Sequence, residues 1–483
     1  MLNLVLALSS GIIGGLLVAI LPQRLKHIDG LRKLVVSLSA VSGMFFSWRT
    51  ALMVFAGKEV QIAGRFGGIA WSINPDPLGV IFGLIASTLW LFAAIYSFGY
   101  MKGKKRQGVY YVYFLISSSV TLGVAFSGNL VALYLFYELL TLATYPLVIH
   151  ERSPEAVKAG SKYIIYSLSG AGAILIAIVI TYSWAGNLNF SDTPILMGNL
   201  RPGLNWLLFL FTVGFGVKAA LMPLHRWLPS AMVAPTPVSA LLHAVAVVYS
   251  GAYGILRVVY SVFGHELIAK LNFKNIIIGV IAFTILAGVI IAAKQDVLKR
   301  RLAYQTISHI SYILLGAFTL HPLGLTGAVM HMISYSMLKI TLFFCAGIIA
   351  EKTGETKISN MKGVGHRLPK TMFVFAIASL GMIGILPLNT FWGKYYLMKG
   401  SIASGKWFLA LVLIASGIVN AICFIPVIVN AFCKAKDKAN IEMGERVAYM
   451  LYPSAILVVA AIFIGLCPGI VWPGVDAVVK WFF

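Results

Sequence analysis

Two ionisable side chains lie within an apolar stretch at residues 205–257, where any charge must be held inside hydrocarbon. Lys218 lies well inside the first apolar run of this stretch, and His243 lies inside the second. Between them come four prolines, Pro223, Pro229, Pro235 and Pro237. Because proline removes a backbone donor and clashes with the preceding turn, a continuous helix through Pro223 is not expected. In a membrane the freed backbone groups need protein or water partners. The stretch therefore predicts a hydrated internal site on an ion path.

Glu138 is the acidic residue that the apolar pattern places at mid-span, about ten residues from either end of its run. A charge at the centre of a membrane helix costs about 2.5–3.5 kcal/mol on insertion scales. Such a group must be paired, hydrated or protonated. One interpretation is a protonated Glu138 that holds helices together. The other is a Glu138–Lys218 pair whose making and breaking changes the proton affinity of the lysine.

Further titratable groups follow in later apolar runs. His331, Tyr335 and Lys339 have the spacing i, i+4, i+8 and would share one helical face, which predicts either a proton-carrying stripe or a polar seam between helices. Lys394 comes late in its run. It could act in proton transfer or snorkel to the outer surface, and Lys218 could snorkel to the inner one. His243 could equally be a packing residue. His309 and Arg49 are interpreted as structural groups.

The elements that position these residues are membrane helices. The chain has 483 residues, of which 59% are hydrophobic, and its mean hydropathy is +0.89, which excludes a soluble globule. Apolar runs long enough to span a bilayer recur from end to end. We predict fourteen spans, at 2–21, 32–56, 78–100, 109–127, 129–149, 163–185, 204–230 (interrupted), 237–256, 274–293, 302–320, 324–349, 371–398 (interrupted), 409–430 and 449–470. The excursions between them, of which 57–77 and 431–448 are among the longest, predict no extramembrane domain.

The net charge of +23 follows the predicted topology. Most of the 38 lysines and arginines fall on one face of the membrane, which predicts that this face is cytoplasmic and that both termini lie outside. The basic tract at 102–106 is interpreted as a topology signal and an anchor to anionic lipid. Nucleic acid is therefore not an expected partner, and the expected location is the plasma membrane of a prokaryote.

No cofactor site is predicted in this chain. The four cysteines show no Cys-x-x-Cys spacing, no histidine pair has metal-ligand spacing beside a carboxylate, and no glycine-rich phosphate loop is present. The sequence leaves open whether the chain counts as an enzyme. Any redox chemistry would belong to partner subunits.

An internal echo predicts two related units. The sequence Pro-Leu-x-x-aromatic occurs at Pro223 and again at Pro387, with Lys218 five residues before the first and Lys394 seven residues after the second. An odd number of spans separates the two positions, so the units would have opposite orientations, as in carriers with inverted repeats. We predict an N-terminal three-helix segment at 1–108, five-helix units at 109–262 and 274–430, and a C-terminal helix within 431–483.

Two motifs carry a resemblance to a known family. The segment 218–243, KAALMPLHRWLPSAMVAPTPVSALLH, and the segment 299–312, KRRLAYQTISHISY, resemble the antiporter-like subunits shared by respiratory complex I, multi-subunit Na+/H+ antiporters and membrane-bound hydrogenases. The resemblance covers roughly residues 100–430. It implies an all-α polytopic membrane protein with about fourteen transmembrane helices, two inverted five-helix repeats and discontinuous helices 7 and 12. It also implies proton-transfer roles for matching positions: Glu138, Lys218, His243, Lys339 and Lys394.

The sequence departs from the family pattern at two positions. Tyr249 stands where some members carry a lysine, and Thr390 replaces a glycine that is common before the second break. The expected function is proton translocation as a subunit of a complex I-related redox assembly. The expected partners are other membrane subunits, including a further antiporter-like subunit and a redox module, together with protons and the lipid bilayer. The alternatives are a subunit of a Na+/H+ antiporter without redox chemistry and a purely structural membrane scaffold.

Overall fold

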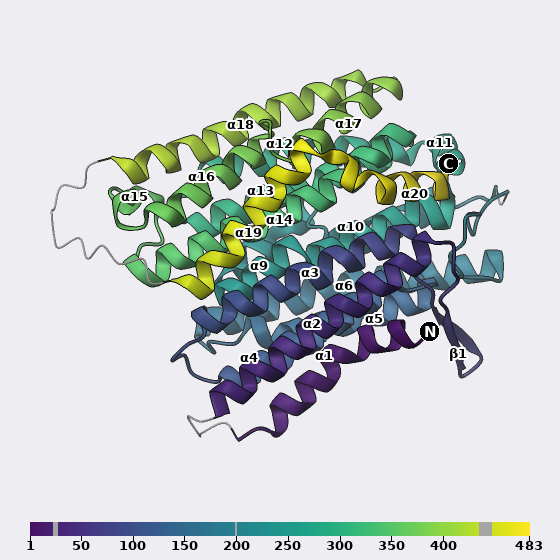
Figure 1. Ribbon diagram of the computed structural model, residues 1–483. Helices are drawn as coiled ribbons and strands as arrows, with labels where there is room; N and C mark the ends of the chain where they lie inside the picture. Colours follow the sequence, from purple (N-terminus) through teal and green to yellow (C-terminus); the bar gives the residue numbers. More distant parts are fainter. Residues whose placement is uncertain (23–27, 199, 434–446) are drawn as a thin grey trace.

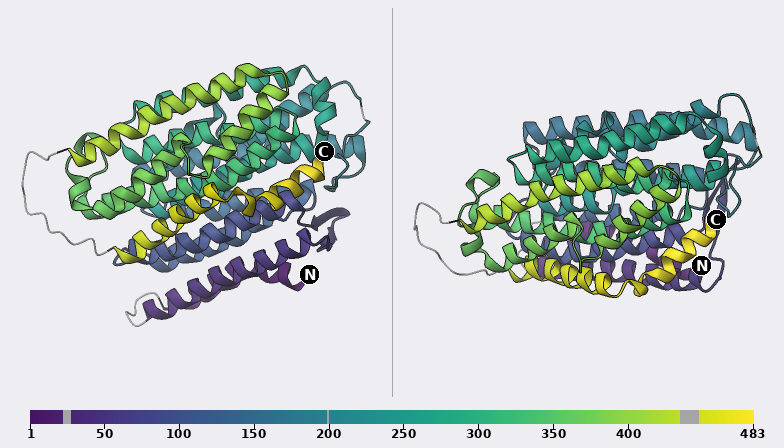
Figure 2. Two further views of the ribbon diagram at one scale, coloured as in Figure 1. Left: turned by 45° about the horizontal axis from the view of Figure 1, so that its top comes forward. Right: turned by 90° about the horizontal axis from the view of Figure 1, so that it is seen from above.

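The computed structural model describes residues 1–22, 28–198, 200–433 and 447–483. This part of the chain is almost entirely helical. The long helices run along one common direction, and the connecting loops gather at the two ends of the bundle (Figures 1 and 2). Both termini lie at the same end (Figure 1). This arrangement agrees with an even number of membrane crossings.

Eleven helical segments of the described ranges are long and apolar enough to cross a membrane. They are α1 (Leu2–Ile20), α2 (Ile28–Phe55), α3 (Pro77–Tyr100), α4 (Gln107–Ala125), α5 (Leu130–Val148), α6 (Pro154–Ala185), the segment Thr236–Phe263, α12 (Phe273–Ala293), α14 (Pro322–Thr353), α18 (Trp407–Phe432) and α19 (Ala448–Leu466). Further helices are α7 (Leu204–Lys218), α8 (Trp227–Ser230), α9 (Thr236–Ala244), α10 (Val247–Arg257), α11 (His265–Lys270), α13 (Leu298–Phe318), α15 (Val364–Arg367), α16 (Pro369–Ile383), α17 (Thr390–Ala403) and α20 (Trp472–Phe482).

Each of the fourteen predicted spans coincides with a helix or an interrupted helix. The three spans outside the eleven are α7 with the short helices that follow it, α13, and the pair α16–α17. The first and third are broken, and α13 carries a run of polar residues that lowers its hydropathy. The prediction of an all-α polytopic membrane protein with about fourteen spans is confirmed.

Burial separates central helices from peripheral ones. The segment that contains α9 and α10 is wholly buried and α14 is nearly so, whereas about a third of the most apolar part of α1 and α2 is buried. The exposed side chains of the outer helices are mainly Leu, Ile, Val and Phe, which suits contact with lipid or with other membrane subunits. The polar residues of the central helices therefore face protein rather than hydrocarbon.

The two predicted helix interruptions are present. Helix α7 ends at Lys218, and after a left-handed residue at Ala220 (φ 57°) the chain continues in short helical turns through α8 to Val233. Helix α16 ends at Ile383, where Gly384 adopts φ 98°, a conformation that favours glycine. Helix α17 begins six residues later. The description of 109–262 and 274–430 as inverted repeats stays a prediction.

A third interruption was not predicted. The expected continuous span at 237–256 is divided between α9 and α10 at Val245 and Ala246. The Ala246 N–H donates to the Leu241 carbonyl, five residues back, so the helix widens there by one residue. Neither proline nor glycine marks these positions, and the pattern of apolar residues continues unbroken across them. The prediction of one uninterrupted helix is therefore wrong.

Two peripheral segments also differ from the sequence analysis. The predicted excursion at 57–77 contains an antiparallel hairpin of β1 (Ile62–Phe66) and β2 (Ile69–Ile73), whose two-residue turn, Gly67-Gly68, has positive φ at both positions. The C-terminal segment holds two helices rather than one, α19 and α20, because Pro468 and Gly469 follow the end of α19. Of the predicted excursion at 431–448, positions 434–446 lie outside the described residues.

Candidate functional site

Glu138 lies in the middle of α5, as predicted, and is half-buried. Its Oε1 atom is shielded from the exterior and has no hydrogen-bond partner among the described residues. On the same helix Leu135, Leu139 and Leu142 are exposed. Glu138 therefore stands at the boundary between the protein interior and the outer surface of the bundle.

Lys218 is completely buried at the last residue of α7. Its Nζ atom donates a hydrogen bond to the backbone carbonyl of Tyr137 and lies 3.4 Å from the centroid of the Tyr137 ring. This full burial excludes the interpretation in which Lys218 snorkels to the cytoplasmic surface. Because α7 ends at this residue, the interruption of the helix and the buried amine coincide.

Glu138 and Lys218 are neighbours without being an ion pair. Four ion pairs with N···O distances up to 4.0 Å occur in the described part of the chain, and this pair is not one of them. Lys218 instead reaches Tyr137, the residue directly before Glu138 in α5. The expected direct contact is therefore absent from this conformation, because the helix presents the carbonyl of Tyr137 to the amine and directs Glu138 toward the boundary.

His243 is fully buried in the last turn of α9, directly before the interruption at Val245. Its Nδ1 atom lies 3.1 Å from the Thr306 hydroxyl of α13, and its ring lies 5.0 Å from the ring of Phe343 on α14. The expected common face with Ser250 is not maintained, because the interruption separates the two residues. His243 thus contacts the central helices α13 and α14.

The predicted stripe on α14 is present. His331, Tyr335 and Lys339 are all fully buried. The rings of His331 and Tyr335 are 5.7 Å apart, and the Lys339 Nζ atom lies 5.7 Å from the Tyr335 ring and 5.9 Å from the Phe343 ring. The same Phe343 ring packs against His243. Lys339 and His243 therefore share one aromatic neighbour.

His309 belongs to this group, although the sequence analysis interpreted it as structural. Its Nδ1 atom lies 3.3 Å from Nε2 of His331, and the two rings stack with centroids 5.4 Å apart. The Tyr312 ring lies 4.9 Å from His309 and 5.1 Å from His331. The sequence signal was available, since the segment from Gln305 to Tyr312 is an unusually polar run inside a helix.

Lys394 lies on the far side of the same group. It is 8% exposed, and its Nζ atom donates to the carbonyls of Met382 (2.8 Å) and Ile383 (2.7 Å) at the end of α16. The amine is 5.6 Å from the Tyr312 ring. Burial and these two hydrogen bonds exclude the snorkelling interpretation in this conformation. Like Lys218, Lys394 is a buried amine at a helix interruption.

Close contacts thus link the candidate residues into two groups. The first group is Glu138 and Lys218. The second, which we call the central file, runs through α9, α13, α14 and α17 and consists of His243, Lys339, Tyr335, His331, His309, Tyr312 and Lys394. The backbone joins the two groups, because Gly251 of α10 packs directly against the main chain at Lys218 and Ala219.

Tyr249 lies beside the central file. It is fully buried, its hydroxyl donates to the Met332 carbonyl (3.0 Å), and its ring stacks on Tyr335 with centroids 6.3 Å apart. Within the described ranges no group of three or more His, Cys, Asp and Glu residues has the arrangement of a metal site.

The fold and the buried amines define a polytopic integral membrane protein with interrupted helices at ionisable residues. Residues 127–419 match the family described as NADH:quinone oxidoreductase/Mrp antiporter, transmembrane. The chain is 33% identical over 417 residues to NADH-quinone oxidoreductase subunit N of Desulforudis audaxviator, covering 83% of this chain and 82% of the relative. It is 27% identical over 406 residues to a Na(+)/H(+) antiporter subunit of Bacillus subtilis, covering 83% and 81%.

Two solved structures share the fold. A chain of the membrane-bound sulfane sulfur reductase, an archaeal respiratory membrane complex, superposes with a TM-score of 0.87 at 23% identity, covering 99% of this chain and 97% of that one. A chain of the Mrp complex from Dietzia sp. gives 0.88 at 19% identity, again covering 99% and 97%. The protein belongs to the NADH:quinone oxidoreductase/Mrp antiporter transmembrane family and is an antiporter-like membrane subunit.

Proposed function

We propose that this subunit moves protons across the membrane through Glu138, Lys218 and the central file, within a complex I-related redox assembly. The central file carries the proposal, because four helices bring two lysines, three histidines and two tyrosines into successive contact away from lipid. Membership of the family supports the same function. The roles of His331 and His309 rest on geometry alone.

The spacing within the file suits proton transfer through water. Transfer between side chains needs heavy atoms about 2.6–3.2 Å apart, or one intervening water. His309 and His331 are 3.3 Å apart, close to direct contact, whereas the amines of Lys339 and Lys394 lie 5.6–5.9 Å from neighbouring ring centroids. Buried polar atoms without protein partners occur along the file, on Lys339, Tyr335, His331, His309 and His243. Such atoms normally bind water.

Glu138 is suited to coupling with a neighbouring subunit. It is half-buried on a helix face whose leucines are exposed, so a partner subunit placed there would change the solvation of its carboxylate. The reported relatives are named as subunits of multi-subunit membrane complexes. We therefore propose further membrane subunits as partners, with a redox module supplying the driving reaction. The basic loop face is proposed as cytoplasmic and both termini as external.

The test is replacement of Glu138 by Gln and of Lys218 by Ala in the intact complex. We expect both variants to assemble, with coupled proton translocation in sealed vesicles abolished, because each loses the group that binds the proton. Exposed residues at the periphery provide matched controls, Glu266→Gln and Lys270→Ala. Translocation at the normal rate in Glu138→Gln or Lys218→Ala would contradict the proposal and favour a structural scaffold.

A second candidate function is that of a Na+/H+ antiporter component without redox chemistry. The observations that favour it are the similarity to the Na(+)/H(+) antiporter subunit of Bacillus subtilis and the shared fold with a chain of the Mrp complex. Isolation of the native complex separates the two candidates. Co-purifying subunits with redox centres would support the first candidate. A redox-free complex that exchanges Na+ for protons would support the second.

A further inference from the structure

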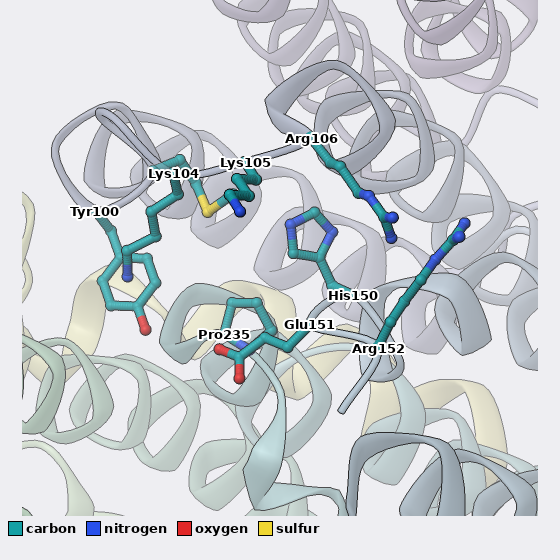
Figure 3. Close-up of a pocket in the computed structure, with 9 residues that line it drawn as sticks. Tyr100, Lys104, Lys105, Arg106, His150, Glu151, Arg152 and Pro235 are labelled. Atoms are coloured by element: carbon teal, nitrogen blue, oxygen red, sulfur yellow. The ribbon is translucent and has the colours of Figure 1, made fainter. Parts of the chain in front are cut away.

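A basic pocket lies at the end of the bundle opposite the termini, where the loops α3–α4 and α5–α6 meet (Figure 3). Its volume is about 390 Å³, within the range of small-ligand sites. The lining residues are Tyr100, Met101, Lys104, Lys105, Arg106, His150, Glu151, Arg152 and Pro235. Four of these side chains are cationic and one is a carboxylate. The pocket is separate from the central file, although Pro235 directly precedes α9.

Two arginines from different loops face this pocket with an unusual backbone. Arg106 has φ 59° and Arg152 has φ 53°, in the left-handed region that residues other than glycine rarely adopt. Their side chains extend toward the same side of the pocket (Figure 3). Among the described residues neither guanidinium has a hydrogen-bond or ion-pair partner. Two strained positions that bring like charges together indicate a role beyond topology, which requires only that the charges be on this face.

The rest of the wall is held in place by contacts within the protein. The Lys104 Nζ atom lies 2.5 Å from the Glu351 carboxylate of α14 and 3.4 Å from the centroid of the Tyr100 ring. The half-buried His150 ring packs edge-on against Tyr110, with centroids 5.7 Å apart. The walls are therefore preorganised, which lowers the entropy that a ligand must lose on binding.

We propose that this pocket binds a phosphate group, with Arg106 and Arg152 as its principal ligands and Lys105 and His150 beside them. The planar guanidinium matches a phosphate through paired hydrogen bonds, and several cations around one space favour an anion with more than one charged oxygen. The volume accommodates the phosphate and part of the group esterified to it. A soluble phosphate and the headgroup of an anionic phospholipid share this chemistry at the membrane surface.

The test compares Arg106→Asn/Arg152→Asn with wild type and with Lys102→Gln, using the full chain in its purified complex. Asparagine tolerates the left-handed backbone, so the loops keep their conformation. Lys102 is exposed in the same loop and does not line the pocket, which controls for loss of positive charge. One arm measures the thermal stabilisation by inorganic phosphate against chloride at equal ionic strength. The other counts, by native mass spectrometry, the phosphatidylglycerol molecules retained from nanodiscs, against phosphatidylcholine.

The two arms identify the source of the phosphate group. We expect wild type and Lys102→Gln to bind in one arm, and the double variant to bind at least about tenfold more weakly in that arm, because two charge-assisted contacts are lost. Stabilisation by phosphate alone would indicate a soluble ligand, and selective retention of phosphatidylglycerol would indicate a lipid. Equal behaviour of all three proteins in both arms would overturn the proposal. If the double variant aggregates, the single variants are judged by the same criterion.

Discussion

The packing of Gly251 against the end of α7 allows a direct perturbation of Lys218 without changing its chemistry. A Cβ atom at Gly251 would lie 2.2 Å from the Ala219 nitrogen and 2.8 Å from the Lys218 carbonyl carbon. Both are main-chain atoms, so no side-chain rotation relieves the clash. Normal carbon contacts are about 3.5–4.0 Å, so α10 and the end of α7 would have to separate by roughly 1 Å in Gly251→Ala. Overpacking of this kind costs about 1–3 kcal/mol.

We therefore expect Gly251→Ala to lower the thermal unfolding midpoint and to slow proton translocation. The separation displaces Lys218 from Tyr137, and a misplacement of about 1 Å in a reacting geometry can reduce a rate by about 10²-fold. Gly172→Ala in α6 is the matched control, because a Cβ atom there has no atom within 4 Å. The control should be neutral or more stable by about 0.5–1 kcal/mol. If both variants behave alike, the close packing at Lys218 has no functional role.

Three further predictions follow from other contacts. Asp76→Asn should lower the free energy of unfolding by about 3–5 kcal/mol in chemical denaturation, because it leaves the buried Arg257 cation without its carboxylate, and unchanged stability would contradict this. His309→Phe keeps the ring but removes the nitrogen 3.3 Å from His331, so translocation should fall by about 10²-fold with assembly intact, whereas a normal rate would remove His309 from the file. Burial lowers the pKa of His150 below its ordinary value of 6.5, so the folded state binds fewer protons and stability falls as the pH drops below about 6.5. In phosphate-free buffer His150→Gln should lose less stability than wild type between about pH 7 and pH 5, and equal losses would contradict the assignment.

The spans and two of the interruptions could be predicted because they depend on local properties. A run of about twenty apolar residues has the length of a bilayer, and the prolines at 223 and 387 prevent a continuous helix wherever the chain is placed. The spacing of His331, Tyr335 and Lys339 likewise fixes a common face without any knowledge of neighbouring helices.

The features that were missed depend on tertiary contacts. The interruption at Val245 involves neither proline nor glycine, so the sequence carries no mark of it. His309 gains its significance from His331, which comes from another helix. The absence of a direct Glu138–Lys218 contact depends on which part of α5 the amine reaches. The hairpin is different, because the Gly67-Gly68 pair between two short apolar segments is a recognisable turn signal.

The most direct test of the central file is the proton conductance of the reconstituted complex with Lys339 replaced by Gln. Lys339 is buried in the middle of α14, and Lys352 is an exposed lysine near the end of the same helix, so Lys352→Gln is the matched control. Proton flux into proteoliposomes is followed with a pH-sensitive dye under an imposed membrane potential. The proposed function predicts that Lys339→Gln abolishes the flux and Lys352→Gln retains it. Equal fluxes in the two variants would contradict proton transfer through the file.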